Sequence, residues 1–301
     1  MMICRQYFQP KTIQEALGIL REFRGEATIL AGGTDLVIDL KTGKKRIQAL
    51  VDISRLNGLD QIREENGNLW IGARVTHAQA AKSDSIQEKA VVLSEACLTV
   101  GSPQVRNMGT LIGNIVNAMP AADAAAALIA LGARVRVVGS DDQERFIPAE
   151  QLYRGPGRSI IDSTREFIPH VEFPIPGSRS GSSFQRLSRR KALALPVLNT
   201  ATFVRLDKGL KVFEEVRMVI GPVSPIPFRP REAEALLRNA PVTIKMIQKA
   251  AEVASEEASP RTSLRGGKEY RKEMVKVLVV RGLRQALVHV HSNLSIGEEG
   301  A

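Results

Sequence analysis

The sequence has few of the residues that build metal centres and membrane spans. Its 301 residues include only two cysteines, Cys4 and Cys97, whereas an iron–sulfur cluster or a structural zinc site takes about four Cys or Cys/His ligands. No stretch reaches the roughly 18 consecutive apolar residues of a membrane helix, and the amino end lacks the apolar core of a secretory signal. We therefore expect a soluble, cytoplasmic protein without a membrane span or a cluster of its own.

Sequence motifs of several common enzyme classes are also missing. The chain contains no GxSxG, HExxH or P-loop string, so hydrolase, zinc protease and P-loop assignments have no direct support. The tightest histidine spacing is His289-Val290-His291, beyond a long helical pattern. We interpret this pair as a solvated helix end and expect no metal site.

Aromatic residues make up only 4% of the chain, whereas basic residues are in excess, with a net charge of +10 and a pI near 9.9. The positive charge gathers in three stretches, Lys41–Arg46, Arg186–Lys191 and Arg261–Lys272. Such an excess attracts nucleic acid, phosphorylated cofactors or an acidic partner, or serves only as a solvated face. Single-strand binders interleave basic with aromatic residues, and the first two stretches contain no aromatic residue. Nucleic acid is therefore not the expected partner.

The first half of the chain alternates helix and strand patterns around glycine turns. Thr12-Ile13-Gln14-Glu15 is a capping box that predicts a helix to about Phe23. Thr76-His77-Ala78-Gln79 resembles a second capping box, where His77 either packs or faces solvent. Further expected elements are a strand at 27–30, a helix after 35, strands near 51–53 and 69–71, a helix over 86–100, a loop-rich passage at 104–114, an Ala-rich helix over 121–131, and strands at 134–138, near 146 and at 167–173.

A domain boundary is expected at 174–183, where small turn-forming residues replace the apolar pattern. Beyond it, strand patterns cover 184–187, 198–206 and 212–220, and helical patterns cover 231–238, 243–258 and 268–290. The turn Asp207-Lys208-Gly209 predicts an antiparallel hairpin. We expect an α+β protein with domains at 1–176 and 177–301, the second a small antiparallel sheet with helices on one face.

Two glycine-bearing segments of the first domain could together hold a diphosphate. They are Ala31-Gly32-Gly33-Thr34-Asp35 and Gly109-Thr110-Leu111-Ile112-Gly113-Asn114. Glycine permits positive φ and lets backbone N–H groups approach an anion, while Thr and Asn add side-chain donors. Because the first segment lacks the GxGxxG spacing, a nicotinamide dinucleotide bound in the usual doubly wound fold is disfavoured.

These segments, together with Ile71-Gly72-Ala73, Gln104-Val105-Arg106-Asn107 and Pro120-Ala121-Ala122-Asp123, closely resemble the FAD-binding medium subunit of the molybdenum hydroxylases. That family includes xanthine dehydrogenases, carbon monoxide dehydrogenase and aldehyde oxidoreductases. The resemblance runs from Phe8 to about Gln285. It implies a two-part FAD-binding domain of the vanillyl-alcohol-oxidase (PCMH) type, followed by an α+β carboxyl-terminal domain.

The resemblance implies FAD as the cofactor and assigns residues to it by position. The first diphosphate loop would be Ile29 to Leu36, and the second would be Thr110 to Asn114. Asp123 would accept a hydrogen bond from a cofactor hydroxyl, and Val100 and Ile168 would touch the cofactor. Arg186 falls near a family lysine close to the flavin. The full set is Ile29, Leu30, Ala31, Gly32, Gly33, Thr34, Asp35, Leu36, Val100, Thr110, Leu111, Ile112, Gly113, Asn114, Asp123, Ile168 and Arg186.

Two departures from the family pattern qualify this assignment. Ile112 stands where the family usually has the first of two adjacent glycines, which changes how closely the backbone can approach a ligand there. The chain also lacks the cysteine-bearing insertion that benzoyl-CoA-type relatives use for an additional iron–sulfur cluster. Low-potential reductive chemistry of that type is therefore not implied.

The function implied is an electron-transfer subunit of a hetero-oligomeric oxidoreductase. A large molybdopterin subunit would oxidise the substrate, a small iron–sulfur subunit would carry electrons through two [2Fe-2S] clusters, and FAD on this chain would reduce a final acceptor such as NAD. No catalytic acid or base stands out. Two alternatives remain at this point, a self-contained flavin oxidoreductase and a basic nucleic-acid-binding protein without cofactor.

Overall fold

The structure, a computed structural model, describes residues 4–190 and 192–298, with side chains as far as Leu294. Lys191 of the second basic stretch and residues 299–301 of the expected second domain lie outside the described residues. The chain divides into two compact units that interleave along the sequence. The first unit takes the residues up to Ala80, Ser102–Met119 and Gly132–Pro174, and the second takes Ala81–Gly101, Pro120–Leu131 and the residues from Ile175 onward.

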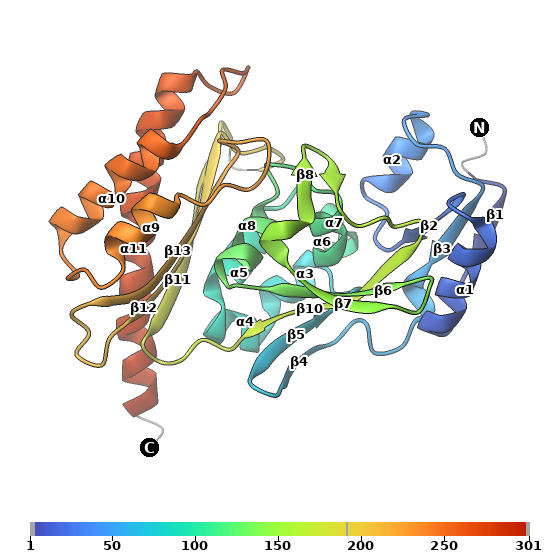
Figure 1. Cartoon of the computed structure of the whole chain (residues 1–301), viewed down its shortest axis with the longest axis horizontal. Coiled ribbons are helices and arrows are strands. Elements are labelled where there is room, and N and C mark those ends of the chain that lie inside the picture. The colour runs from blue at the N-terminus through green and yellow to red at the C-terminus, as the bar shows by residue number, and fades with distance from the viewer. Residues whose placement is uncertain (1–3, 191, 299–301) are drawn as a thin grey trace. The chain divides into compact units, whose positions relative to one another are not determined.

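The first unit begins with a parallel three-stranded sheet of order β1-β3-β2 (Figure 1). Its strands are β1 (Gln6–Phe8), β2 (Ala27–Leu30) and β3 (Ala49–Asp52). Helix α1 (Ile13–Phe23) is capped as predicted, because the Thr12 hydroxyl accepts a hydrogen bond from the Glu15 N–H at 3.1 Å. The helix buries Ala16, Leu17 and Leu20, so the apolar stripe in the sequence marks its core face.

The first unit also contains an antiparallel five-stranded sheet of order β4-β5-β10-β6-β7. Its strands are β4 (Ile62–Glu65), β5 (Asn68–Gly72), β6 (Arg134–Gly139), β7 (Glu144–Pro148) and β10 (Glu166–Pro174). Leu69 and Ile71 are completely buried, whereas Trp70 between them stacks on His170 of β10. This alternation gives the sheet one apolar and one polar face.

The remaining short elements of the first unit connect these sheets or follow them. They are α2 (Leu36–Lys41), η1 (Ile53–Arg55), α3 (His77–Lys82, which continues two residues into the second unit), α6 (Pro103–Met108), α7 (Leu111–Val116), η2 (Ala149–Leu152), β8 (Tyr153–Gly155) and β9 (Arg158–Ser159). Strands β1 and β4 were not expected from the sequence.

The passage predicted as loop-rich, 104–114, is instead mostly helical. Ser102 caps α6 by accepting a hydrogen bond from the Val105 N–H at 3.3 Å, and Pro103 occupies the first turn. Thr110 caps α7 in the same way through the Gly113 N–H at 3.0 Å. The prediction failed because Gly109 was interpreted as part of a long loop, whereas it ends one short helix just before the next begins.

The helix predicted over 86–100 is also two helices, α4 (Asp84–Lys89) and α5 (Val91–Thr99). They are separated at Ala90, whose backbone leaves the helical region with φ −144° and ψ 50°. Both helices contribute completely buried residues, including Ile86, Val92 and Leu93. A continuous apolar pattern does not reveal such a break, because both pieces bury the same kind of side chain.

The second unit contains an antiparallel sheet of order β11-β12-β13. Its strands are β11 (Ser180–Leu187), β12 (Leu198–Leu206) and β13 (Phe213–Gly221). The predicted hairpin is confirmed, because the Asp207 carboxylate accepts hydrogen bonds from the Lys211 and Val212 N–H groups at 2.7 and 2.8 Å. These bonds close the turn between β12 and β13.

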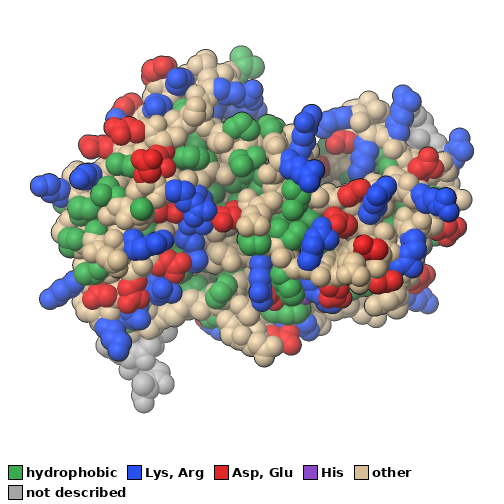
Figure 2. All heavy atoms as spheres, viewed as in Figure 1, with side chains coloured by type: hydrophobic (Ala, Val, Ile, Leu, Met, Phe, Trp, Pro, Cys, Tyr) green, Lys and Arg blue, Asp and Glu red, His purple; other side chains and the backbone are tan. Residues whose placement is uncertain are grey.

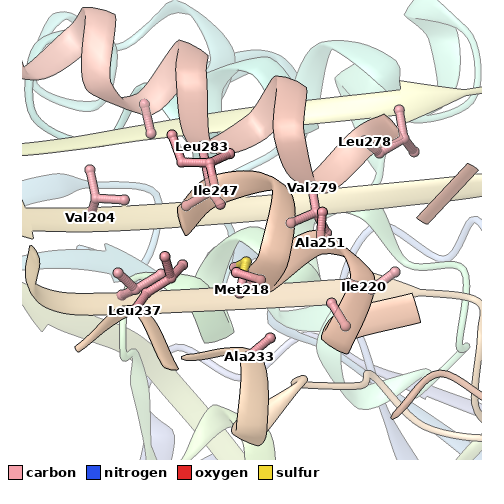
Figure 3. Close-up of a cluster of buried hydrophobic side chains, with 14 of the residues drawn as sticks. Val204, Met218, Ile220, Ala233, Leu237, Ile247, Ala251, Leu278, Val279 and Leu283 are labelled. Atoms are coloured by element: carbon pink, nitrogen blue, oxygen red, sulfur yellow. The ribbon is translucent and has the colours of Figure 1, made fainter. Parts of the chain in front are cut away.

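Helices α9 (Arg231–Leu237), α10 (Ile244–Glu257) and α11 (Lys268–Glu298) cover one face of this sheet (Figure 1). Figure 3 shows the apolar core between them, where side chains of the strands meet those of the helices. Its labelled members are Val204, Met218, Ile220, Ala233, Leu237, Ile247, Ala251, Leu278, Val279 and Leu283. All of them are nearly or completely buried.

The expectation of helices on one face only is wrong, because α5 and α8 (Asp123–Ala130) pack on the other face. The Arg217 side chain of β13 donates to the Ala130 carbonyl at 2.7 Å, and the Val92 N–H donates to the Ser182 hydroxyl of β11 at 3.4 Å. Only the helices that follow the strands in the chain were expected to cover this sheet. A sheet with two apolar faces needs cover on both, and here the first half of the chain supplies the second layer.

No helix in the described part of the chain is long and apolar enough to cross a membrane.

Candidate functional site

The first glycine segment leaves the end of β2 and enters α2. Gly33 has φ +68°, a left-handed conformation that glycine adopts without strain, and its carbonyl accepts the Val37 N–H at 3.0 Å. The backbone N–H groups of Gly32, Gly33, Thr34 and Asp35 donate to no acceptor among the described residues. Consecutive unpaired N–H groups at a turn of this kind form an anion-binding nest.

The second glycine segment lies between α6 and α7. The neighbouring residues 75–77 hold it, because the His77 N–H donates to the Gly109 carbonyl at 3.0 Å and the Leu111 N–H donates to the Val75 carbonyl at 3.1 Å. Thr110 also forms an isolated bridge with Thr76. These bonds hold the start of α7 in place without using the first segment.

The structure brings the two segments together within the first unit. A Cβ atom on Gly32 would lie only 1.9 Å from the Met108 carbonyl oxygen and 3.0 Å from the Gly109 Cα. A Cβ on Gly109 would lie 3.4 Å from the Thr34 hydroxyl. Gly32 is therefore required for close packing of one backbone on the other, and the sequence-based interpretation of this glycine as ligand-facing was incomplete.

Some side chains of the second segment are buried in the core, whereas another has a polar atom that could bind a ligand. Leu111 is completely buried and Ile112 is 7% exposed, so the residue that replaces a family glycine directs its side chain into the core. Asn114 has a buried side-chain oxygen with no hydrogen-bond partner among the described residues. A bound hydroxyl group or water would satisfy this acceptor.

His77 lies beside the second segment, and it was not among the site residues predicted from the sequence. Its side chain is 2% exposed, and its Cδ2 atom would lie 3.5 Å from a Cβ on Gly109. Burial lowers the pKa of His77 to about 4, and the positive charge of Arg106 adds to this effect. The imidazole is therefore neutral at pH 7 and packs against the second segment.

Asp123 belongs to the second unit, where it is 5% exposed at the start of α8. Its Oδ1 atom accepts a hydrogen bond from the Asn199 amide at 2.6 Å. Its Oδ2 atom accepts from the Thr99 hydroxyl at 3.0 Å and from the Arg186 Nε at 3.1 Å. Three of the roughly four acceptor positions of a carboxylate are thus taken by the chain itself.

The ion pair between Asp123 and Arg186 is nearly buried, with side-chain exposures of 5% and 10%. Burial raises the pKa of Asp123, while Arg186, Asn199 and Thr99 act in the opposite direction. Burial also raises the pKa of the Cys97 thiol, with a further contribution from Asp123. Asn199 and Thr99 were not predicted as site residues, because single polar residues within an apolar strand and helix belong to no motif.

Val100 and Ile168, the two predicted apolar contacts, lie in different units. Val100 ends α5, where its N–H donates to the Cys97 carbonyl at 3.3 Å. Ile168 is 3% exposed in β10, at the irregular register between Phe167 and His170. The remaining predicted residues, Ile29, Leu30, Ala31 and Leu36, are half-buried around the first glycine segment.

Two family models match consecutive parts of the chain. Residues 3–176 match the family described as the FAD binding domain in molybdopterin dehydrogenase. Residues 183–286 match the carbon monoxide dehydrogenase flavoprotein C-terminal domain. The two matches together cover nearly the whole chain.

Individual relatives are similar over almost their full lengths. A protein of Escherichia coli described as a putative xanthine dehydrogenase FAD-binding subunit is 29% identical over 282 residues, covering 93% of this chain and 95% of that protein. The alpha subunit of the 6-hydroxypseudooxynicotine dehydrogenase complex of Paenarthrobacter nicotinovorans is 32% identical over 288 residues, covering 93% and 94%.

A carbon monoxide dehydrogenase structure from Hydrogenophaga pseudoflava superposes with a TM-score of 0.88 at 28% sequence identity, covering 95% of this chain and 98% of that one.

Proposed function

This chain belongs to the family of FAD-binding subunits of the molybdopterin dehydrogenases, also called molybdenum hydroxylases. From this premise we propose that the chain takes electrons from the [2Fe-2S] clusters of a partner subunit. It passes them through FAD to a final acceptor such as NAD. Bound FAD supplies the redox chemistry, because a flavin exchanges electrons singly or in pairs. The task of the protein is to bind the cofactor and to orient it.

The observation that carries the proposal is the junction of the two glycine segments. Four consecutive N–H groups, which donate to no acceptor in the described part of the chain, lie beside the backbone of Met108 and Gly109. This arrangement fits the two negative charges of a diphosphate, because consecutive backbone N–H groups at a glycine turn can approach an anion closely and donate hydrogen bonds to it. The Asn114 side-chain oxygen, which has no hydrogen-bond partner within residues 4–190 and 192–298, provides an acceptor in the same unit. The residues present therefore fit FAD.

We assign roles to the predicted residues on this basis. The segments Ile29–Leu36 and Thr110–Asn114 would hold the diphosphate, and Val100 and Ile168 would provide apolar contact. Asp123 would accept a cofactor hydroxyl at its fourth acceptor position. Arg186 would act chiefly on Asp123, because its Nε donates to that carboxylate at 3.1 Å.

We further propose that the chain works in a hetero-oligomer with an iron–sulfur subunit and a molybdopterin subunit, in the cytoplasm. Support comes from relatives that are described as subunits or medium chains of dehydrogenases, which favours this function over a self-contained oxidoreductase. The proposed domain division, 1–176 and 177–301, is supported by family matches that end at 176 and begin at 183.

The first test is a visible absorption spectrum of the purified chain, recorded before and after addition of FAD and desalting. We expect about one FAD per chain, identified by chromatography after release. Gly33→Val should weaken retention, because a branched side chain is strained at φ +68° and would lie within 3.1 Å of Leu30 and Val37. A wild-type chain that retains no flavin, alone or with its partners, would contradict the proposal.

The acceptor needs a separate test. Anaerobic addition of NADH to the FAD-loaded chain should bleach the flavin absorbance if NAD is the acceptor, because electron transfer between the two cofactors runs in both directions. Bleaching by a reduced quinone or ferredoxin, but not by NADH, would assign a different acceptor.

A further inference from the structure

The second and third basic stretches, which begin at Arg186 and Arg261, are far apart in the sequence. Residues of both lie side by side on one surface of the second unit. Arg189, from the stretch between β11 and β12, donates through Nη1 to the Leu264 carbonyl at 3.1 Å. Val197, at the end of the same connection, lies 3.4 Å from where a Cβ on Gly266 would be. Arg189 and Val197 therefore both lie against the loop between α10 and α11.

This loop presents one leucine almost completely to solvent. Leu264 is 97% exposed at a tight turn in which Ser263 and Gly266 exchange backbone hydrogen bonds of 3.1 Å. Arg189 holds the turn from one side, and Arg271 holds it from the other by donating to the Ser263 hydroxyl at 2.7 Å and to the Pro222 carbonyl at 2.9 Å. The turn is thus a fixed support for an exposed apolar side chain.

More apolar side chains are exposed nearby in sequence on the two segments. Leu193 is 59% exposed, Leu195 is 54% exposed and Tyr270 is 48% exposed. Figure 1 shows the loop between α10 and α11 standing out at one end of the unit, and Figure 2 shows lysine and arginine side chains beside exposed hydrophobic ones there. Exposed apolar side chains gathered within a charged rim are typical of protein interfaces.

The charge of this surface is mainly positive. Residues 259–272 contain five cations and one acid, Glu269, and residues 186–197 contain no acid. Arg189, Arg190, Arg261, Arg265 and Lys268 form no ion pair among the described residues, whereas arginines elsewhere in the unit, such as Arg205 and Arg229, do. Burial lowers the pKa of Arg271, and the neighbouring Arg265 and Arg261 lower it further.

We propose that Leu264, with Leu193 and Leu195 and the surrounding arginines, is the docking surface for another subunit of the same complex, one that offers an apolar depression rimmed by Asp and Glu side chains. Leu264 is the anchor, and the cations steer and orient the partner. This inference rests on the proposed function, because it requires that the chain assembles with other subunits.

Charge complementarity favours this occupant over the others. A nucleic acid would use the cations but would have no use for an almost fully exposed leucine beside them. A second copy of this chain would place Arg189, Arg190, Arg261, Arg265 and Lys268 against the same five cations, and their electrostatic repulsion would oppose binding. An acidic protein surface with a pocket for Leu264 uses both features.

The test is co-expression of the full chain with the iron–sulfur and molybdopterin subunits of its own complex, followed by affinity purification and native mass spectrometry. The variants are Leu264→Ser and Arg265→Glu, singly and together. The matched controls in the same unit are Val288→Ser, at a residue that is 54% exposed, and the pair Lys208→Glu and Lys211→Glu on the hairpin. FAD content and Tm are measured for every variant.

We expect the double variant to lose at least tenfold in affinity for the partner subunits, with FAD content and Tm unchanged and with full assembly of both controls. Affinity of the wild type should fall with added salt, and the Arg265→Glu variant should show a weaker salt dependence. The absence of effects on FAD and Tm separates a docking role from a structural one.

Three outcomes would overturn the proposal. Assembly of the double variant at wild-type affinity would remove this surface from the interface, while the proposed function would stand. A wild-type dimer that Leu264→Ser dissociates, or DNA binding that Arg265→Glu abolishes, would assign the surface to a different occupant. A wild-type chain that retains FAD but never assembles would contradict the subunit role itself, and with it this surface.

Discussion

The glycine junction of the first unit and the Asp123 cluster of the second unit are built on opposite principles. At the junction, backbone N–H donors have no partner among the residues that the structure describes, and the close packing of Gly32 on Met108 and Gly109 holds them in place. In the cluster, nearly every acceptor position of Asp123 is filled by Asn199, Thr99 and Arg186. Unpaired donors indicate a binding site, whereas a saturated carboxylate stabilises the fold even where it also touches a ligand.

The largest effect is expected from Asp123→Ala. The substitution leaves Arg186 nearly buried without its counter-charge, which costs about 3–5 kcal/mol of unfolding free energy. Urea unfolding of the FAD-free chain measures this loss. The matched control is Asp39→Asn, whose ion pair with Lys44 is solvent-exposed and is worth less than about 1 kcal/mol.

The double variant Asp123→Ala with Arg186→Met sharpens this prediction. Because it removes both charges, it should be more stable than Asp123→Ala alone. If Asp123→Ala weakens FAD binding but leaves the FAD-free chain as stable as wild type, Asp123 is a ligand-binding residue and not a structural one.

Gly32→Ala should come next. A Cβ atom at 1.9 Å from a carbonyl oxygen forces the two segments apart, at a cost of about 1–3 kcal/mol in stability, and FAD affinity should fall at least tenfold. Fluorescence titration with FAD measures the affinity. Gly18→Ala is the control, because nothing lies within 4 Å of a Cβ on that helical glycine, and it should raise stability by about 1 kcal/mol. Unchanged affinity in Gly32→Ala would mean that the junction does not hold the cofactor.

The junction should also be sensitive to acid. The pKa of His77 is about 4 in the folded chain and near 6.5 in the unfolded chain, so the unfolded state binds the proton first. Stability is therefore lost as pH falls below 6.5, by about 2 kcal/mol between pH 7 and pH 5 for this residue.

Urea midpoints of wild type and His77→Phe across this range measure the His77 contribution as a difference. His170, whose pKa is also lowered to about 4 by burial, acts in the same direction in both proteins and cancels. Equal pH dependence in the two proteins would show that His77 is accessible to protons in the folded state.

The smallest effect is expected from Thr110→Ala. The substitution removes the hydroxyl that accepts the Gly113 N–H at 3.0 Å and should cost about 1 kcal/mol. Thr110→Ser retains the cap and serves as the control. A loss of FAD affinity much larger than the loss of stability would show that this hydroxyl contacts the cofactor directly.

The α+β fold class, the FAD cofactor and the oxidoreductase class were predicted from the sequence and are confirmed by the family matches and by the carbon monoxide dehydrogenase structure. Individual elements with local signals were also predicted, such as α1 from its capping box and the β12–β13 hairpin from its turn. Elements without such signals were missed. Strands β1 and β4 are short, and the break at Ala90 lies inside a continuous apolar pattern.

The site was predictable only in part, for a related reason. Glycines at the two segments were selected because their spacing is local, but the contact of Gly32 with Met108 joins residues 76 positions apart (108 − 32). The assignment of the seventeen proposed cofactor residues stays a prediction. His77, Thr99 and Asn199 became visible only when the folded chain placed them beside residues already selected.

The sequence by itself determined the elements with local signals, such as α1 and the β12–β13 hairpin, and it also determined the two glycine segments and the excess of positive charge. These features depend on neighbouring residues and on composition. The tertiary structure alone decided that Gly32 is needed for backbone packing, that Asp123 is almost saturated, and that two basic stretches join around Leu264. Each of these depends on contacts between residues far apart in the chain, and burial and hydrogen-bond partners are properties of such contacts and not of local sequence.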